Sequence, residues 1–328
     1  MSKFSRRIFM AGVAASFALA SGSAQAADWP QRPVTVVVPQ AAGNSPDVLC
    51  RIITDKLSRA LGQQFIVENK AGAANVVGMQ SVARATNDGY TFVFATSAAL
   101  VTNPYTIKAL SYDPIKDFVP VAMVAKSHHV LLVNPKVKAN NLAELIALEK
   151  QAPGSLSLAV DGPRNISGLI AQAINKDAGT KMVLVPYNTI SNAVQDTISG
   201  RTPVTIQSAS VVEPFIKDGS LRPIAVAGNQ RIASLPDVPA ISETLKSVEL
   251  QGWFMIMAPA GTPAAIVETM SKAVAKAIAE PDVLERAPTL GFEMEKGDNT
   301  TPAGAKSFLA AQYAYTGQIL KELGVEPN

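Results

Sequence analysis

The sequence predicts an α/β fold with mostly parallel sheets, arranged as two similar lobes around a cleft. Short β-branched segments alternate along the chain with helical apolar patterns, which is typical of sheets covered by helices. The segments 34–57 and 156–174 also share one layout, in which a strand-type run precedes a polar, glycine-containing loop that opens a helix. Because parallel sheets bind ligands at such loops, we expect the two units to face each other across the cleft.

The individual elements follow from local patterns. Runs rich in β-branched and aromatic residues predict strands at 34–38, 65–67, 90–95, 130–133, 156–160, 182–185, 204–207, 224–227 and 253–257. Apolar residues at helical spacing predict helices at 46–61, 76–85, 142–150, 166–174, 190–199, 211–217, 263–279 and 302–323. Cys50 is the only cysteine, so no intramolecular disulfide forms, and its apolar neighbours predict a small buried residue.

The first 26 residues are typical of a secretory signal. A basic start ending in Arg6 and Arg7 precedes an apolar run at 8–20, and small residues precede a cleavage point before Ala27. The apolar run is too short to span a bilayer, and the paired arginines leave the general secretory and twin-arginine routes open. We therefore expect export, cleavage and no direct membrane insertion.

The charge distribution excludes nucleic acid as a partner. Three of the 29 basic residues and none of the 26 acidic residues lie in the signal segment, so the rest of the chain has 26 of each. A neutral chain with scattered charges and 6% aromatic residues has neither the basic surface of a phosphate-backbone binder nor a polybasic membrane patch.

The sequence lacks the motifs of common enzyme classes. His128 and His129 are the only histidines, and as neighbours entering a strand they point to opposite faces, so we expect structural or surface roles and no shared zinc ion. No nucleophile elbow, phosphate-binding loop or dinucleotide-binding glycine motif is present. We expect no catalytic residue, metal or cofactor, although a hydrolase or transferase that uses Asp47 or Asp161 stays open as an alternative.

Several segments resemble the extracytoplasmic solute-binding proteins of tripartite tricarboxylate transporters, the Bug or TctC-like family. The resemblance covers nearly all of the chain after the signal. The matching segments are WPQRPVTVVVPQAAGNSPD (29–47), IVENKAGAANVVG (66–78), DGYTFVFATS (88–97), YDPIKDFVPVAMVA (112–125), LVNPKVKANNLAELIALEKQAPGSLSLA (132–159), LVPYN (184–188), LPDVPAISE (235–243) and GWFMIMAPAGTP (252–263).

The resemblance implies a periplasmic binding protein of the type II-like fold that closes on a small carboxylate. It implies a first lobe built from 27–126 and 251–328, a second lobe at 127–250, and delivery of the ligand to membrane permease subunits by a monomer. Carried over by position, the ligand-binding residues are Ala42, Asn44, Ser45, Asp47, Ser97, Ala98, Arg164, Asn165, Ile166, Ser167, Tyr187 and Gln207. Ser45 and Asp47 have helix capping as a competing interpretation.

The chain departs from the family pattern where ligand specificity is set. Gly43-Asn44-Ser45-Pro46 replaces a glycine-rich run ending in threonine, and the loop at 162–167 contains Arg164 and lacks the family's histidine. A guanidinium binds a carboxylate through paired hydrogen bonds. We therefore expect Arg164 to recognise a second carboxylate, which favours a dicarboxylate, either aromatic of the phthalate or terephthalate type or aliphatic.

Two further expectations concern partners and packing. A ligand-loaded partner of a membrane receptor is the alternative to a permease-linked binding protein, because the sequence does not distinguish the two. Trp253 is expected to serve mainly core or hinge packing, since large aromatic residues mostly serve burial.

Overall fold

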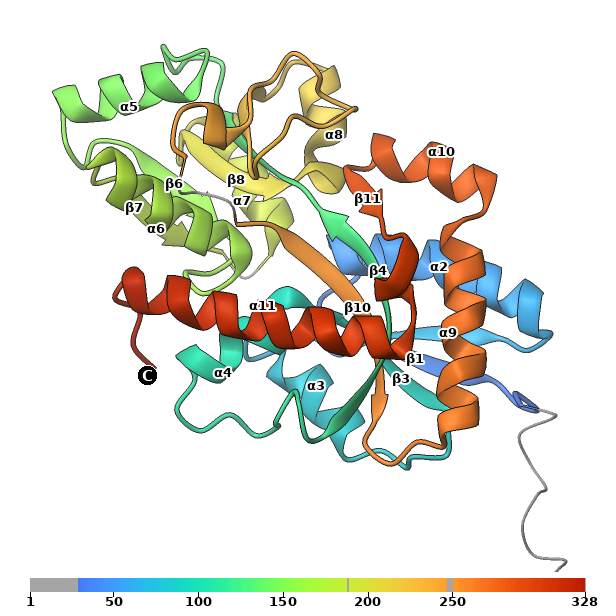
Figure 1. Ribbon diagram of the computed structural model, residues 1–328. Helices are drawn as coiled ribbons and strands as arrows, with labels where there is room; N and C mark the ends of the chain where they lie inside the picture. The colour runs from blue at the N-terminus through green and yellow to red at the C-terminus, as the bar shows by residue number, and fades with distance from the viewer. Residues whose placement is uncertain (1–28, 188, 247–249, 328) are drawn as a thin grey trace, which may run out of the picture.

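The computed structural model describes residues 29–187, 189–246 and 250–327. The expected signal segment lies outside these residues. Figure 1 shows two α/β lobes joined by long strands, with the green and yellow segments mainly in one lobe and the blue and red segments mainly in the other. Within the described ranges, no helix combines the length and apolar character needed to cross a membrane.

The first lobe contains a six-stranded sheet that combines the early and late parts of the chain. Its strands, in spatial order, are β11 (Phe292–Met294), β4 (Phe118–Ser127), β10 (Gly252–Pro259), β3 (Thr91–Thr96), β1 (Val34–Val38) and β2 (Phe65–Asn69). Helices cover both of its faces. These are α2 (Ser45–Leu61), α9 (Ala264–Ile278) and α10 (Pro281–Thr289) on one face, and α3 (Val76–Ala83), η1 (Ala98–Thr102), α4 (Asn103–Thr106) and α11 (Pro302–Glu322) on the other.

The second lobe contains a five-stranded sheet from the middle of the chain. Its strands, in spatial order, are β7 (Val183–Pro186), β6 (Ser157–Val160), β8 (Val204–Ser208), β5 (His129–Val133) and β9 (Arg222–Val226). The helices around it are α5 (Leu142–Gln151), α6 (Ile166–Ala178), α7 (Ile190–Ser199) and α8 (Ala209–Lys217). Short 3₁₀ turns, η2 (Ile241–Glu243) and η3 (Gly297–Thr300), complete the described elements. Leu320 of α11 packs in the core of this lobe, so the last helix contacts both lobes.

Both sheets are mixed, which corrects the expectation of mostly parallel sheets. Five of the nine adjacent strand pairs are antiparallel. The reason is the crossover between the lobes, because β4 leaves the first lobe, β10 returns to it, and the two pair antiparallel along their length. The strand β4 is not among those predicted from the sequence, although its segment 118–127 is almost entirely buried.

The structure confirms the predictions that depend only on neighbouring residues in the chain. Helix α2 has Pro46 in its first turn and ends at Gly62, which adopts the left-handed conformation that glycine tolerates best. Cys50 is fully buried in the first core, as expected. The eight residues of β10 are all buried, since helices cover both faces of its sheet.

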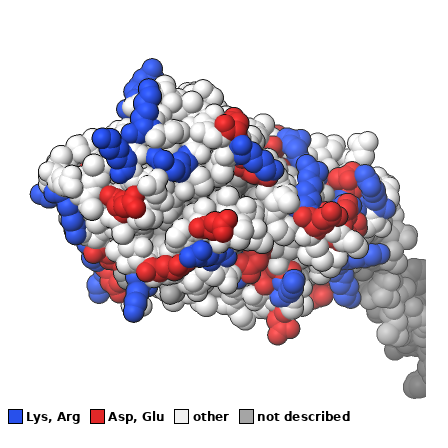
Figure 2. Space-filling model, turned by 90° about the horizontal axis from the view of Figure 1, so that it is seen from above, with Lys and Arg blue, Asp and Glu red and all other residues white. Residues whose placement is uncertain are grey.

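Positive and negative side chains are interspersed over the face seen in Figure 2. No large area of one sign appears on that face, which agrees with the equal numbers of basic and acidic residues outside the first 26. In the part of the chain that the structure describes, no group of three His, Cys, Asp or Glu residues is placed to hold a metal ion.

Candidate functional site

A small cavity of about 40 Å³ lies where the two sheets meet at the crossover strands. Both lobes contribute to its wall. The residues that line it are Gln40, Ser45, Pro46, Thr96, Ser97, Ala98, Ser127, His129, Asp161, Asn165, Ile166, Ile190, Gln207, Ser208, Gly252, Trp253 and Phe254. No lysine or arginine occurs among these described lining residues.

Several helices begin at the wall of this cavity. Helix α2 begins at Ser45, α6 at Ile166 and α7 at Ile190, and each of these first residues lines the cavity. Helix α8 begins directly after Ser208, which also lines it. The first backbone N–H groups of a helix have no partner within the helix and carry a partial positive charge. The side of the cavity where these helices begin therefore favours an anionic group, although no cationic side chain is among its described lining residues.

Three serine hydroxyls connect the lobes at the cavity. The Oγ atom of Ser45 lies 3.3 Å from that of Ser127, which lies 3.2 Å from the Oγ atom of Ser208. Ser208 donates back to Ser45 over 3.1 Å, closing a triangle. Ser45 belongs to the first lobe, Ser208 to the second, and Ser127 to the crossover strand. This contact holds only while the lobes are together.

Asp161 places a carboxyl group in the wall from the second lobe. The Ser167 hydroxyl donates to its Oδ1 atom, and the Asn165 side chain donates to its backbone oxygen over 2.8 Å. Burial raises the pKa of Asp161 to about 6, although the Ser167 hydrogen bond opposes this shift. Gly168 permits this tight loop, because a Cβ atom there would lie 2.2 Å from the Gly162 oxygen.

His129 places an imidazole in the same wall, from the start of β5. The ring is buried, and its Nδ1 atom has no hydrogen-bond partner in the structure. Burial lowers the pKa of His129 to about 4, and a hydrogen bond to the backbone of Ser127 only partly opposes this. The ring is therefore neutral at neutral pH, and its Nδ1 atom is enclosed without a hydrogen-bond partner.

Asp47 supports the wall from behind. Its Oδ2 atom accepts the Gly43 backbone N–H over 2.8 Å, and its Oδ1 atom accepts the Asn69 side chain over 2.9 Å. Burial raises the pKa of Asp47, but hydrogen bonds from Arg51, Gly43 and Asn69 outweigh this, so the pKa lies below its ordinary value. Both oxygens of the Asp47 carboxylate therefore accept hydrogen bonds, and the carboxylate holds the loop before α2 in place.

The structure brings together half of the residues that the sequence analysis selected. Six of them line the cavity, namely Ser45, Ser97, Ala98, Asn165, Ile166 and Gln207. Asp47 and Ser167 lie behind the wall and position it. The remaining four, Ala42, Asn44, Arg164 and Tyr187, do not line it.

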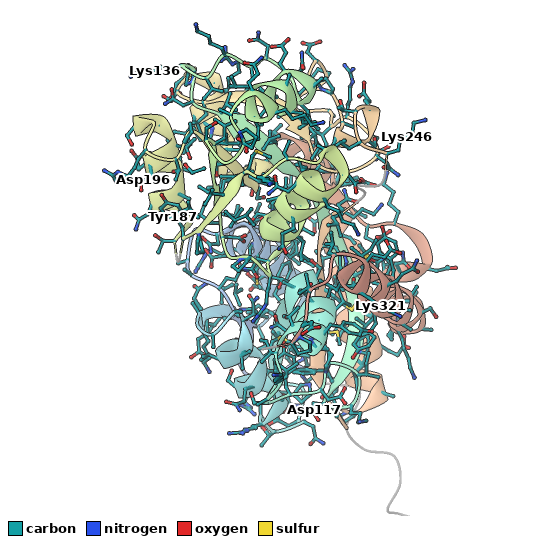
Figure 3. The ribbon with its side chains drawn as sticks, turned by 90° about the vertical axis from the view of Figure 1, so that its left-hand side faces the viewer. Asp117, Lys136, Tyr187, Asp196, Lys246 and Lys321 are labelled. Carbon is teal, nitrogen blue, oxygen red and sulfur yellow. The ribbon has the colours of Figure 1, made fainter. Side chains whose placement is uncertain are left out.

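Arg164 and Tyr187 have other surroundings. The Tyr187 hydroxyl donates to Asp196 over 2.7 Å and lies 3.2 Å from the Thr202 hydroxyl. Figure 3 shows Tyr187 and Asp196 close together at the edge of the second lobe. Arg164 is half-buried in the loop before α6 and is not part of the cavity wall.

Sequence reasoning missed the contribution of the crossover. The strands β4, β5 and β10 border the cavity and bring four residues into its wall, namely Ser127, His129, Gly252 and Phe254. The sequence predicts a structural or surface role for His129, and the structure buries it in the cavity wall. In the sequence, the two adjacent histidines before the apolar run 130–133 are the one feature that marks this part of the cavity wall. Where they lie relative to the other lobe depends on the crossover.

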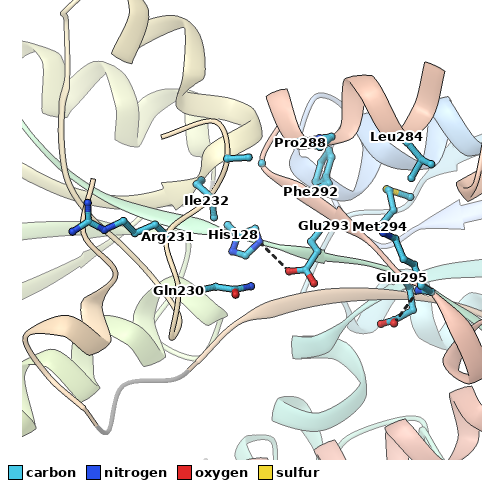
Figure 4. A pocket seen from close by; sticks show the side chains of 13 residues that line it. His128, Gln230, Arg231, Ile232, Leu284, Pro288, Phe292, Glu293, Met294 and Glu295 are labelled. Carbon is cyan, nitrogen blue, oxygen red and sulfur yellow. Dashed lines mark hydrogen bonds and ion pairs between the residues drawn. The ribbon is translucent and has the colours of Figure 1, made fainter. Parts of the chain in front are cut away.

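Two other hollows adjoin this region. One, of about 250 Å³, shares Ser97, Ile166 and Trp253 with the cavity and is also lined by Lys126. The other is a groove of about 520 Å³ between the lobes, lined by His128, the segment 230–233 and side chains of α10 and β11 (Figure 4).

Comparison with known proteins identifies relatives along almost the whole chain. A family model described as the tripartite tricarboxylate transporter family receptor, TctC, matches residues 49–325. A UPF0065 protein of Bordetella bronchiseptica is 35% identical over 310 residues, covering 94% of this chain and 91% of the relative.

Solved structures give the same result. Rpa4515 of R. palustris, solved with adipate, is 30% identical with a TM-score of 0.87, covering 92% of this chain and 100% of that one. MatC from Rhodopseudomonas palustris, solved with bound malate, is 26% identical with a TM-score of 0.82, covering 89% and 100%. The two-lobe α/β fold expected from the sequence is thereby confirmed, and the chain belongs to the TctC family of tripartite tricarboxylate transporter receptors.

Proposed function

We propose that this protein is a periplasmic solute-binding protein that captures a small dicarboxylate between its lobes and delivers it to a membrane permease. The observation that carries the proposal is the cavity between the two sheets, where four helices begin and where the described lining residues include no lysine or arginine. Helix N-termini bind a carboxylate through backbone N–H groups. The adipate and malate of the two R. palustris structures are both dicarboxylates, which supports this ligand class.

Binding is coupled to lobe closure in this proposal. A cavity of about 40 Å³ is much smaller than typical ligand pockets of about 300 to 1,000 Å³. The lobes therefore separate to admit a ligand, and the serine triangle breaks when they do. Because the ligand contacts both lobes only when they are together, it shifts the equilibrium toward the closed form.

The adjoining hollow provides room for the second carboxylate. It is lined by apolar residues such as Leu169 and Phe308, with Lys126 as its cationic side chain among the described lining residues. The Nζ atom of Lys126 lies 3.3 Å from the Oε1 atom of Glu293. Because this ion pair is partly exposed, a ligand carboxylate can replace Glu293 as the partner of Lys126. An aliphatic chain or an aromatic ring fits between the two carboxylates, and Arg164 remains the competing residue for the second one.

A panel of ligands tests the proposal. Mono-, di- and tricarboxylates, including phthalate and terephthalate, are screened by thermal shift, since a ligand that binds the folded state raises the midpoint. Hits are measured by calorimetry and by solution scattering, where we expect a 1:1 complex, chemically unchanged ligand and a smaller radius of gyration. The absence of any carboxylate binding contradicts the proposal, and turnover of a bound carboxylate favours the hydrolase alternative with Asp161.

A further inference from the structure

The element η1 (Ala98–Thr102) follows β3 and forms part of the wall of both the cavity and the adjoining hollow. Its first residue, Ala98, and the preceding Ser97 line the cavity. Ser97, Val101 and Thr102 line the adjoining hollow. A ligand that occupies both spaces therefore contacts this one segment, and the position of its backbone affects both ends of the ligand.

The segment η1 is a π-helix, in which an N–H group donates to the carbonyl oxygen five residues earlier. The Asn103 N–H donates in this way to the Ala98 oxygen. The next donor in the pattern is residue 104, but Pro104 has no N–H group, so the Ala99 oxygen lacks this partner in the helix. Because Ala99 is fully buried, its carbonyl group needs a donor from elsewhere in the chain.

Tyr112 supplies that donor. Its hydroxyl donates to the Ala99 oxygen over 2.6 Å and accepts the Asn103 side-chain amide over 3.1 Å. The same amide donates to the Ala74 oxygen over 2.7 Å. Ala74 lies in a turn where three consecutive residues, 73–75, have left-handed backbone conformations, which are strained for residues with a Cβ atom. Tyr112 and Asn103 therefore hold the π-helix and this strained turn together.

The surroundings of the Tyr112 ring keep the hydroxyl in place. Tyr112 is 5% exposed, and its ring packs edge-on against Phe118 with centroids 6.1 Å apart. Burial raises the pKa of the Tyr112 hydroxyl, so the group keeps its proton and remains a donor. Tyr112 is not among the described residues that line the cavity or the adjoining hollow. Any effect of this hydroxyl on a ligand is therefore exerted through η1.

We propose that Tyr112 is a positioning residue for ligand binding, whose hydroxyl holds η1 in the conformation that presents Ser97 and Ala98 to the ligand. This inference rests on the proposed function and adds to it a residue outside the binding site. Without the hydroxyl, the Ala99 carbonyl group is buried without this donor, which favours other arrangements of η1. Binding must then restore the original arrangement, so the apparent affinity falls.

Two matched tyrosine variants test the inference. Tyr112→Phe removes only the hydroxyl, and Tyr105→Phe, in α4, removes a hydroxyl that donates to the Tyr313 backbone oxygen over 3.0 Å. Tyr105 is also absent from the described residues that line the two spaces, so it controls for the loss of a hydrogen bond to a backbone oxygen. Melting curves measure stability, and calorimetry measures the binding of adipate, malate and terephthalate.

The two variants are expected to differ in binding but not in stability. In Tyr112→Phe, the affinity for each probe that binds the natural chain falls about fivefold or more, the scale of one buried hydrogen bond. In Tyr105→Phe it changes less than about twofold, although the melting midpoint falls by up to about 4 °C in both variants. Hydrogen exchange of the free protein is a second measurement. Peptides covering 96–103 exchange about fivefold or more faster in Tyr112→Phe and at the natural rate in Tyr105→Phe.

The outcomes separate this inference from the proposed function. If no probe and no other carboxylate binds the natural chain, the proposed function fails, and the inference fails with it. If carboxylates bind and Tyr112→Phe keeps the natural affinity, or if Tyr105→Phe loses as much affinity as Tyr112→Phe, only the inference is overturned. Unchanged exchange of the 96–103 peptides in Tyr112→Phe overturns it as well.

Discussion

Two hollows at the crossover between the lobes differ in volume and in the number of charged side chains that line them. His128 and His129 are adjacent in the chain, yet His128 lines the large groove and His129 lines the small cavity. The groove has about 520 Å³ and contains Arg231, Glu293, Glu295 and Lys296. The cavity has about 40 Å³, and its described wall has Asp161 as its one residue with a charged side chain.

The two hollows also differ in whether their polar groups already have hydrogen-bond partners. In the groove, Arg231 pairs with Glu243, and the His128 ring lies 3.5 Å from Glu293 and 3.0 Å from the Gln251 amide. These three contacts give the groups involved hydrogen-bond partners, and the exposed Arg231–Glu243 pair contributes little to stability. In the cavity, His129 Nδ1 and the helix N-termini have unused hydrogen-bonding capacity. We therefore expect substitutions in the cavity, and not in the groove, to change ligand binding.

The largest effect is expected from filling the cavity. In Ser208→Phe, the ring occupies the space between the lobes and removes one hydroxyl of the serine triangle, so closure fails and dicarboxylate affinity falls at least about 100-fold. Calorimetry measures the affinity, and scattering shows an expanded form with and without ligand. Ala233→Phe, in the groove, is the matched control, and a comparable loss there contradicts the contrast between the two hollows.

The pH dependence of stability is the next largest effect. The folded pKa of Asp161 is raised to about 6, so its contribution is present at low pH and is lost as the pH rises from 4 to 6. The folded pKa of His129 is lowered to about 4, so its contribution is lost as the pH falls through the same range. The two contributions, each on the order of 3 kcal/mol, oppose each other in the natural chain.

Single substitutions uncouple these contributions. Relative to the natural chain, the free energy of unfolding of Asp161→Asn rises between pH 4 and 6, and that of His129→Asn falls. Urea unfolding at several pH values measures both slopes. Glu295→Gln, in the groove, is the control and leaves the profile unchanged. Parallel profiles for all three variants are the result that contradicts the assigned protonation states.

A smaller effect is expected from Trp253, which serves the core as well as the cavity wall. Its ring packs edge-on against Phe308 with centroids 5.1 Å apart. Trp253→Phe leaves a partly empty site and lowers the free energy of unfolding by about 1 to 2 kcal/mol. Ligand affinity falls less than about fivefold, below the effect of cavity filling. Abolished binding with an unchanged melting midpoint would show that Trp253 is mainly a ligand contact.

The smallest effect is expected from Arg164. Because its side chain is not part of the cavity wall, Arg164→Ala changes dicarboxylate affinity less than about threefold, whereas loss of a contact to the second carboxylate costs about 1.5 to 3 kcal/mol. Lys126→Gln is the paired variant in the adjoining hollow. A loss of about 10-fold or more in Arg164→Ala that spares the matching monocarboxylate assigns the second carboxylate to Arg164.

Local residue patterns were sufficient for most elements. The strand Val34–Val38 and the helix Ile190–Ser199 have the bounds that the sequence predicts, because β-branched runs, apolar spacing and a terminal glycine act over a few neighbouring residues. The loops that open α2 and α6 were predicted for the same reason. Ser45, Asn165 and Ile166 were therefore found in the cavity wall, since a helix start fixes where its first residues lie.

The tertiary structure determines which residues lie across the cavity from those loops. The strand β4, its antiparallel pairing with β10, and the positions of Ser127 and His129 depend on contacts between segments more than 120 residues apart in sequence. The position of Arg164 also depends on such contacts. The sequence predicts a ligand contact for Arg164, but in the fold this residue is not part of the cavity wall. A local pattern fixes which residues begin a helix, but side-chain direction across a cleft is set by strand register and by how the lobes pack, and both arise from long-range contacts.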